Sequence, residues 1–490
     1  MAEDHVRITI EEEQKHNPIV LSPDDHGLLN ELALAQETDD TRYSYLFKDE
    51  QITKIQRVPE IMLRQRNFKE YYKPREIPIG PLHANSKHLG KRALKAKFTA
   101  KFIKNSGQTG EILLKEIKKN INEIKQRFDE IEIHNLALDD ERLSRMLFLG
   151  GCSILQFIYS YVSHNLLEFK INNGQAALIQ QDLFLLENQI PFRVLIVLMN
   201  LSSQNYEWII NIYQFIFTNV MAPVNSNSLR RHLMNIKCLI PGENSTQRLF
   251  VDKEAVHLLD LLRSELLFGD GRERKHSLQR SNRYELFGDH GHERKLSLQR
   301  CNPFSDYKRS FRNVQDLKAA GIKLKPSYTC GLKSVSFTTG FFIAGQLKLP
   351  PLIVDDSTAR KLLNLVAYEM CPDNYRTNYA VTSYLSFLDS LIASEQDVKD
   401  LRSALQNHLS SDAEVAQLFN TIGSNLVPHD AYFDVKNKIQ SHYERKCAVW
   451  MAQGCNDHCR SPWAILALLA AIAALVLTAI QTYCAMLSKT

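Results

Sequence analysis

The chain contains one apolar run, residues 463–483, that constrains its fold more than any other feature. No Asp, Glu, Lys or Arg occurs between residues 461 and 488, and Trp463 and Tyr483 lie at the two ends of the run. A helix needs about 20 apolar residues to cross the hydrocarbon core of a bilayer, and Trp and Tyr side chains favour the headgroup regions. The alternative is a buried core helix, but soluble folds seldom contain a helix of this length that is apolar on every side. The sequence therefore predicts a single C-terminal transmembrane helix over residues 461–487.

The two flanks of this run predict on which side of the membrane the body lies. Residues 1–14 are acidic and have no apolar core, which argues against a signal peptide. A chain without a signal peptide and with one C-terminal span is expected to be tail-anchored, with its body in the cytosol. Arg445, Lys446 and Arg460 precede the run and a single basic residue follows it, in agreement with the positive-inside rule. A body on the extracellular face is the alternative.

The composition of the remaining chain indicates a globular body and argues against two classes of protein, nucleic-acid-binding and disulfide-rich. With 44% hydrophobic residues in a length of 490, most of the chain can bury a core, as about three domains or as one large body with appendages. A net charge of +5 over this length is too small to indicate a nucleic-acid partner. The nine cysteines are odd in number and lack paired spacing, which argues against a disulfide framework.

Changes in composition along the chain predict its organisation. Two acidic clusters mark a mobile N-terminal arm, and a polar repeat interrupts an otherwise helical body. The predicted parts are the arm 1–45, the N-terminal part of the helical body 46–268, a disordered repeat insertion 269–310, the C-terminal part of the body 311–450, a juxtamembrane segment 451–460 and the transmembrane helix 461–487.

The insertion consists of a near-tandem repeat. The sequence LFGDGRERKHSLQRSN, which begins at Leu267, returns as LFGDHGHERKLSLQRCN at Leu286. One duplicated unit is too little for a solenoid, and its polar, Gly-containing composition is typical of a disordered loop. Each copy presents the pattern Arg-Lys-x-Ser-Leu, so Ser277 and Ser297 are candidate phosphorylation sites, where a phosphate would lie beside several arginines.

A basic segment at residues 87–104 has two interpretations. It carries seven Lys and Arg residues and no acidic residue, while Leu94, Phe98 and Phe102 recur at helical spacing. A basic amphipathic helix can lie on anionic lipid. The favoured interpretation is a helix with a solvated basic face, whose apolar stripe enters the core. Contact with anionic lipid is the alternative, and no nucleic-acid partner is expected.

Other patterns predict a mainly α-helical body with one small β-hairpin. Residues 114–131 carry an apolar seam at three- and four-residue spacing, typical of one helix of several turns. The uncharged residues 146–167 predict a buried helix pair, with a second membrane span as the alternative. Pro191 is expected in the first turn of a helix that the preceding polar residues cap. Residues 334–356 alternate around two glycines and predict the hairpin, closed by Pro350-Pro351.

The chemistry-bearing residues give a weak signal for an enzyme. The chain has no phosphate-binding Gly-rich loop, no Gly-x-Ser-x-Gly elbow, no His-Glu-x-x-His helix and no dinucleotide fingerprint. We therefore expect no cofactor, and an enzyme is the less favoured class. If there is catalysis, Glu187 or Glu369 with His83 are the candidates. The favoured interpretation of Glu187 is a buried carboxylate with a basic partner, because no nucleophile lies near it in the sequence.

Cysteines near the apolar run are candidate metal ligands and candidate acylation sites. The spacing Cys455-x3-Cys459 alone is weak evidence for zinc, which usually needs two ligand pairs, so no metal site is predicted. Reversible acylation of Cys455, Cys459 or Cys484 beside a membrane span is the favoured interpretation.

Several segments, taken in order, resemble a plant family catalogued as domain of unknown function 247, over about residues 55–487. The matching segments are IQRVP at 55–59, PIGPLH at 78–83, DLFLLENQIP at 182–191, LPPL at 349–352, NLVAYE at 364–369 and YLSFLD at 384–389. A C-terminal span is also typical of that family. The residues that carry the motif, for which a structural role is expected, are Asp182, Glu187, Asn188, Gln189, Pro191, Tyr368 and Glu369.

The resemblance implies a plant membrane protein with largely unassigned biochemistry. The chain has Ala84 where the family usually has His, and it has Gly150 where the family usually has Asp. If those positions bound a metal or took part in catalysis, this member would be impaired, which favours a scaffold or recognition role. Some grass members are implicated in pollen self-incompatibility. We therefore expect a membrane-tethered interaction or recognition module, related to signalling or self-incompatibility, with an unidentified protein partner.

Overall fold

A computed structural model describes most of the chain after the N-terminal arm. The described residues are 54–64, 66–83, 89–129, 132, 134, 138–220, 255–268, 313–329, 331–339, 345–374, 379–423, 426, 430–444 and 462–487. By its internal contacts the chain divides into two units, Met1–Ile52 and Thr53–Thr490, and all the described residues belong to the second. The predicted arm, the repeat with Ser277 and Ser297, and the juxtamembrane Cys455 and Cys459 lie outside the described residues.

Helices form most of the described structure, which confirms the predicted mainly helical class. The α-helices before the repeat are α2 (Glu60–Leu63), α3 (Leu89–Ser106), α4 (Gly110–Lys119), α5 (Ile121–Lys125), α7 (Asp140–Val162), α8 (Asn173–Asp182), α9 (Phe192–Leu201), α10 (Asn205–Val220) and α13 (Leu258–Phe268). Those after it are α15 (Val314–Ala319), α16 (Thr358–Glu369), α17 (Ala380–Leu391), α18 (Glu395–Leu401), α19 (Asp412–Gly423), α20 (Phe433–Glu444) and α22 (Pro462–Leu487). Short 3-10 helices include η1 (Arg66–Tyr72), η2 (Pro81–His83), η3 (Leu166–Phe169), η4 (Leu186–Asn188), η6 (Leu332–Ser334), η7 (Pro372–Asn374) and η8 (Asp430–Tyr432).

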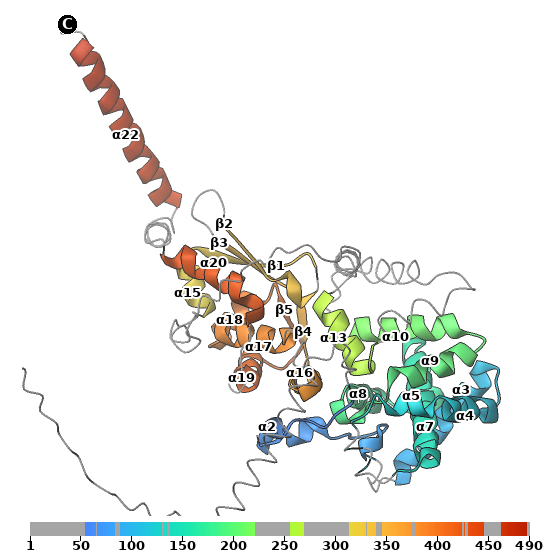
Figure 1. Ribbon diagram of the computed structural model, residues 1–490. Helices are drawn as coiled ribbons and strands as arrows, with labels where there is room; N and C mark the ends of the chain where they lie inside the picture. Colours follow the sequence, from blue (N-terminus) through green and yellow to red (C-terminus); the bar gives the residue numbers. More distant parts are fainter. Residues whose placement is uncertain are drawn as a thin grey trace, which may run out of the picture. The chain divides into compact units, whose positions relative to one another are not determined.

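Helix α7 lies at the centre of the first group, in contact with α3, α4, α9 and α10 (Figure 1). The Asp139 carboxylate caps its start by accepting from Arg142 N at 2.6 Å. The uncharged stretch 146–167 was predicted as a buried helix pair. Its residues up to Val162 instead belong to one mostly buried helix, and residues 163–165 and Leu167 after it are exposed. Of the described helices, α7 alone is long and apolar enough to cross a membrane, but 78% of its apolar window is buried inside the protein. Within this helix the buried Gln156 Nε2 donates to Ser160 Oγ at 2.9 Å, so part of its polar surface is satisfied by the helix itself.

The basic helix α3 turns its apolar stripe into the core, as the favoured interpretation predicts. Phe98 and Phe102 are completely buried, and α3 packs along α7. Lys95 Nζ donates to Pro78 O at 2.8 Å, and Lys101 forms an ion pair with Glu168. Two of the seven cations are thus engaged by the body itself, which weakens the argument for anionic lipid.

The seam predicted as one helix at residues 114–131 is broken at Asn120. The main-chain N–H and the side-chain amide of Asn120 both donate to Glu116 O, so α4 ends there and α5 begins. The described seam residues Ile117, Ile121, Ile124 and Phe128 are buried, whereas Leu114 is partly buried. Phe128 forms an isolated parallel bridge with Ile55. The apolar period therefore indicated which residues face the core. It could not predict that the Asn120 side chain would compete for the helical hydrogen bonds and end the helix.

The strand prediction is confirmed in part and corrected in part. Strands β2 (Ser336–Thr339) and β3 (Gly345–Leu349) pair antiparallel, as predicted. The hairpin was predicted as the one strand pair, which is wrong: β1 (Ile322–Pro326) adds a parallel partner on the other side of β3. The chain beyond Pro350-Pro351 also leaves this sheet, because β4 (Leu352–Val354) pairs in parallel with β5 (Leu405–Asn407). Strands of three to five residues with charged or polar outward positions give too weak a period-2 signal to predict.

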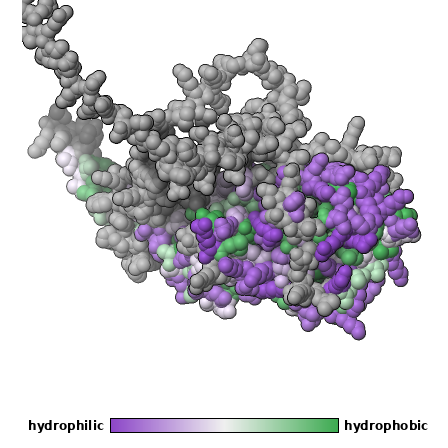
Figure 2. All heavy atoms as spheres, turned by 60° about the horizontal axis from the view of Figure 1, so that its bottom comes forward, coloured by the Kyte–Doolittle hydropathy of each residue, from purple (hydrophilic) through white to green (hydrophobic). Residues whose placement is uncertain are grey.

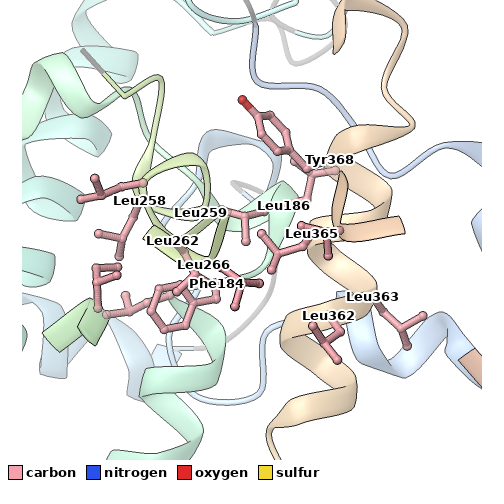
Figure 3. Packing of buried hydrophobic residues seen from close by; sticks show 14 of the residues in the cluster. Phe184, Leu186, Leu258, Leu259, Leu262, Leu266, Leu362, Leu363, Leu365 and Tyr368 are labelled. Atoms are coloured by element: carbon pink, nitrogen blue, oxygen red, sulfur yellow. The ribbon is translucent and has the colours of Figure 1, made fainter. Parts of the chain in front are cut away.

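The hydrophobic core is continuous from the helices before the repeat to those after it. Figure 3 shows side chains from both parts in one cluster, in which Phe184 and Leu186 lie close to leucines of α13 and α16. The labelled members are Phe184, Leu186, Leu258, Leu259, Leu262, Leu266, Leu362, Leu363, Leu365 and Tyr368. Every residue of α16 is buried, so this helix packs fully within the core that both parts of the chain share.

Helix α22 differs from the rest because its apolar side chains are exposed. On the body, large exposed apolar residues such as Ile61, Leu167 and Tyr328 occur singly, and the face in Figure 2 mixes many hydrophilic side chains with small hydrophobic areas. On α22 (Pro462–Leu487) the described apolar stretch is Leu469–Thr482, which is shorter than the predicted transmembrane helix over residues 461–487. The structure thus confirms a helix at this place, and the membrane-spanning role is taken up as a proposal below.

Candidate functional site

The segment 182–191, which we call the motif segment, carries most of the family-type polar residues. At its start, at the end of α8, Asp182 is completely buried. Its carboxylate accepts main-chain N–H groups from Arg75 at 2.9 Å, Glu76 at 2.6 Å and Ile77 at 2.9 Å. Burial raises the pKa of Asp182, whereas the three amides and the Arg360 guanidinium 3.8 Å away act to lower it. This side chain therefore holds the extended, Pro-rich stretch before η2.

Asn188 continues the same function two residues further along that stretch. Its Oδ1 accepts from Ile79 N at 2.6 Å and from Gly80 N at 3.1 Å. Its Nδ2 donates to Ile77 O and to Asp182 O, both at 2.9 Å. A side-chain amide offers two donors and an acceptor oxygen with two lone pairs, and all four positions are used here. Asn188 is thus saturated by the main chain.

Gln189 links the motif segment to α13. Its Nε2 donates to Leu183 O at 2.8 Å and Leu185 O at 2.7 Å, and its Oε1 accepts from Leu259 N at 3.1 Å. The prediction that Glu187-Asn188-Gln189 caps the next helix is therefore wrong. Pro191 occupies the N-cap position of α9, without a side-chain cap, because the polar side chains before it are committed to other main-chain groups.

Glu187 has a main-chain partner in place of the expected basic one. Its Oε1 accepts from Val58 N at 3.1 Å, and the residue is half-buried. Burial raises the pKa of Glu187, while the Val58 amide and the Arg57 charge oppose that rise. The Arg57 guanidinium itself forms an ion pair with Glu132. Glu187 therefore fixes the stretch IQRVP against the motif segment.

Glu369, at the end of α16, is completely buried and fully engaged. It forms an ion pair with Arg263 of α13 at 2.8 Å. It also accepts from Val381 N at 3.1 Å and from Thr382 N and Thr382 Oγ1 at 2.9 and 2.8 Å, at the start of α17. Carboxylates at a helix N-terminus stabilise it by satisfying free amides and by opposing the helix dipole. The neighbouring Tyr368 packs edge-on against the His257 ring, 4.8 Å between centroids.

His83 lies in η2, largely buried. Burial, aided by the Arg57 charge, lowers the pKa of His83 to about 4, so the ring is neutral at physiological pH. A pair of catalytic groups needs a carboxylate that can reach a substrate. The side chains of Glu187 and Glu369 each accept from the protein itself, so the arrangement favours structural roles for both.

Sequence reasoning missed two members of this network, Arg360 and Asn364. Asn364 Oδ1 accepts from Leu186 N at 2.8 Å, and its Nδ2 donates to Tyr71 O and Arg360 O at 3.1 and 2.8 Å. Arg360 donates to Lys73 O and faces Asp182. Polar residues four apart within an otherwise apolar helix were the available signal.

Gly80 marks a place where two main-chain segments approach each other closely. A Cβ built on Gly80 would lie 2.7 Å from Glu187 O and 2.9 Å from Gln189 O, so only glycine allows the two main chains to approach this closely. Gly150 in α7 is also closely packed, in this case against a side chain: a Cβ built on it would lie 3.0 Å from Ile79 Cγ2. The second departure from the family pattern, Ala84, lies outside the described residues.

The predicted modification sites fall mostly outside the described residues, and the described residues contain no cluster of metal ligands. Within the described ranges, no group of three or more His, Cys, Asp or Glu side chains is placed to hold a metal ion. The described free cysteines, Cys152 and Cys371, are buried. Cys484 falls within the backbone of α22, while Ser277, Ser297, Cys455 and Cys459 lie outside the part of the chain that the structure describes, so these modification sites remain predictions.

Together these contacts define a class of protein: a mainly helical body in which buried Asp, Asn, Gln and Glu side chains hold distant main-chain segments. The chain belongs to the plant family DUF247, described as a plant protein of unknown function, whose model matches residues 55–477. It is also 27% identical over 451 residues to a UPF0481 protein of Arabidopsis thaliana, covering 89% of this chain and 86% of that relative. No solved structure matches the chain.

Proposed function

We propose that this protein is a membrane-tethered interaction module, held by α22 and acting through binding by its helical body. The observation that carries the tether is the exposure of consecutive apolar side chains along one helix. Leu469, Leu475 and Leu477 are 59%, 71% and 59% exposed. Exposed apolar surface of this extent is unfavourable in water and marks a membrane or partner contact. The sequence extends the same apolar character over residues 463–483, long enough for a bilayer.

The binding role of the body is supported by the burial and the hydrogen bonds of its motif residues. Asp182, Asn188, Gln189 and Glu369 are buried and occupied by protein groups, which suits a rigid scaffold better than a reaction centre. We infer an unidentified protein partner, in signalling or in recognition of the self-incompatibility kind. An additional anionic lipid contact would have to use the exposed cations of α3, such as Lys97 and Lys104. Reversing both to Glu would then abolish binding to phosphatidylserine vesicles, and unchanged binding would exclude that contact.

The tether is tested by extraction of the full chain from membranes at alkaline pH. The wild type is expected in the membrane pellet. The double variant Ile472→Arg, Val476→Arg is expected in the supernatant, because each central Arg costs about 2.5–3.5 kcal/mol on insertion. Leu167→Arg, on an exposed body residue, is the matched control and should pellet with the wild type. Release of the wild type into the supernatant would refute the membrane tether.

Sidedness is tested separately with a glycosylatable tag placed after Thr490. We expect a mass increase that a glycosidase reverses, which corresponds to a body in the cytosol and a C-terminus on the other side. An unmodified tag, together with a body that is protected from protease in sealed vesicles, would place the body on the extracellular side instead.

The alternative, a membrane-bound enzyme using a buried Glu and His, predicts a different response to charge-neutral substitution. A catalytic carboxylate replaced by Gln leaves stability near that of the parent. For Glu369→Gln we expect the free energy of unfolding to fall by about 3–5 kcal/mol, because Arg263 loses its counter-charge in a buried site. For Glu187→Gln, whose carboxylate accepts from the Val58 amide alone among the described main-chain groups, we expect a loss of about 1 kcal/mol. Equal stability of wild type and Glu369→Gln, measured by urea unfolding, would favour the enzyme.

A further inference from the structure

A cavity of about 220 Å³ opens between α7, α8, α10 and α13 on one side and the β4–α16 connection on the other. None of the polar motif residues Asp182, Glu187, Asn188, Gln189 and Glu369 lines it, although α16 contributes to both. Its apolar wall consists of Leu262, Leu266, Leu352, Leu362 and Leu365. Ligand sites are usually mainly apolar pockets with a few placed polar groups, and those for drug-sized molecules start near 300 Å³. A cavity of this kind therefore suits a smaller molecule with an apolar body.

The cation on the cavity wall is Lys361, which is only 8% exposed. Its Nζ donates to Asn219 O at 2.8 Å and lies 6.0 Å from the Phe184 ring centroid. An ammonium group carries three N–H donors, and Asn219 O is the one hydrogen-bond acceptor that the described residues give it. Burial lowers the pKa of Lys361 to about 8, against the opposing effect of Asp355, so the amine is mainly protonated at pH 7. A buried ammonium with donors to spare favours an additional acceptor.

Asp355 also lines the cavity, but its carboxylate is committed to the start of α16. Its Oδ1 accepts from Ser357 N, Ser357 Oγ and Thr358 Oγ1 at 2.9, 2.6 and 3.0 Å. Burial raises the pKa of Asp355, but these hydrogen bonds and the Lys361 charge outweigh it and lower the pKa overall. The negative charge of Asp355 disfavours a ligand that carries two negative charges. It still leaves Lys361 available for a single carboxylate.

We propose that this cavity binds a small monocarboxylic acid with an apolar body, its carboxylate on Lys361 Nζ and its body against the leucines. Tyr161, which lines the cavity, brings a phenol that can donate to the same carboxylate. A cationic ligand is disfavoured by Lys361. A phosphate is disfavoured because the described residues that line the cavity include no Arg, whose guanidinium would bind two phosphate oxygens at once. This inference is independent of the membrane tether and of the proposed protein partner.

The test uses the full chain in nanodiscs and three probes of equal size: 3-phenylpropanoate, 3-phenylpropanol and 3-phenylpropylamine. Affinities are measured by isothermal titration calorimetry, with empty nanodiscs subtracted. The carboxylate is expected to bind at least tenfold more tightly than the alcohol or the amine. Equal affinity of carboxylate and alcohol, or no saturable binding of the carboxylate, would overturn the proposal.

Two variants locate the site. Lys361→Met should weaken 3-phenylpropanoate at least tenfold, whereas Lys323→Met, which removes an equal charge from an exposed strand position, should leave it unchanged. Gln180→Trp places a bulky ring at a half-buried cavity residue without touching the Lys361 bond, and should abolish binding of all three probes. If Lys361→Met does not fold, Gln180→Trp decides the question. Undiminished carboxylate binding in the folded Gln180→Trp variant would refute the site.

Discussion

The Asp182 carboxylate illustrates how a single residue sustains this fold, because three successive main-chain amides and Arg360 all depend on it. Removing a buried hydrogen-bonded charge leaves each of those partners without compensation in a dry environment. The same holds for Asn188, Gln189 and Asn364, whose amides bind main chain and not solvent. Residues of this kind therefore stabilise the fold through the main-chain groups that they bind.

For Asp182→Ala we expect the free energy of unfolding to fall by about 3–5 kcal/mol, because Arg360 loses a buried counter-charge and three amides lose their acceptor. Asp140→Ala is the matched control: Asp140 is exposed and pairs with Lys125 at the surface. Its loss should change stability by less than about 1 kcal/mol. Urea unfolding followed by circular dichroism measures both. Similar midpoints for the two variants would contradict the assigned role of Asp182.

His257 gives a prediction of pH dependence. It is completely buried, its Nδ1 accepts from Asp260 N at 3.1 Å, and burial lowers its pKa to about 4, with the Asp260 charge opposing. Its pKa in the unfolded chain is about 6.5. Between these values the unfolded chain binds a proton that the folded protein does not. Stability is therefore fully present above about pH 6.5, and about 3 kcal/mol is lost as the pH falls to about 4.

Other groups titrate in the same window, so the measurement must isolate His257. His257→Asn keeps an acceptor for Asp260 N and removes the titration. The difference in unfolding free energy between wild type and this variant should increase as the pH rises from 4 to 6.5 and stay constant above that. A difference that does not change with pH would show that folding leaves the pKa of His257 unchanged.

At the scale of elements, close approach of main chains depends on glycine. The stretch before η2 passes so near η4 that a methyl group on Gly80 would meet two carbonyl oxygens. Main-chain atoms cannot move aside as a side-chain end can. The break between α4 and α5 is a second case, where Asn120 ends a helix whose apolar seam continues. In both cases one small or polar residue determines the path between elements.

Gly80→Ala is expected to destabilise the protein by about 1–3 kcal/mol, because the new methyl group forces the two segments apart. Gly174→Ala is the control, on an exposed position of α8 where the nearest atom to a Cβ is an Asn172 oxygen at 3.4 Å. There the better helix propensity of Ala should make the change neutral or stabilising by up to about 1 kcal/mol. Thermal unfolding distinguishes them; a destabilised Gly174→Ala with an unchanged Gly80→Ala would reverse this argument.

At the scale of the whole molecule, the core joins both parts of the helical body across the repeat. A protein with one continuous core should unfold in one transition. Leu259→Ala in α13 and Leu365→Ala in α16 should each lower the same transition, by about 2–5 kcal/mol. Leu167→Ala, 80% exposed, should leave it unchanged. Two separate transitions, each shifted by only one of the core variants, would indicate two independently folding domains.

Much of the fold was predictable because helices are local. The apolar period of residues 94–102 and the lack of charge from residue 146 to Val162 indicated buried helices, and the order of short motifs identified the family. The second sheet and β1 were missed because their strands are short and pair with distant segments. For the site, the sequence named Asp182, Glu187 and Glu369 and expected structural roles. It could not name their partners, and it missed Arg360 and Asn364.

The sequence by itself determined the helical class, the family and the apolar run near the C-terminus, since each depends on the spacing of residues within one short segment. Tertiary structure alone decided what the polar motif residues hold. Asp182 binds an amide 105 positions away and Leu186 binds an Asn 178 positions away. It also decided that Lys361 borders a cavity. The physical reason is that a hydrogen bond requires two groups within about 3 Å, and folding alone brings such distant groups together.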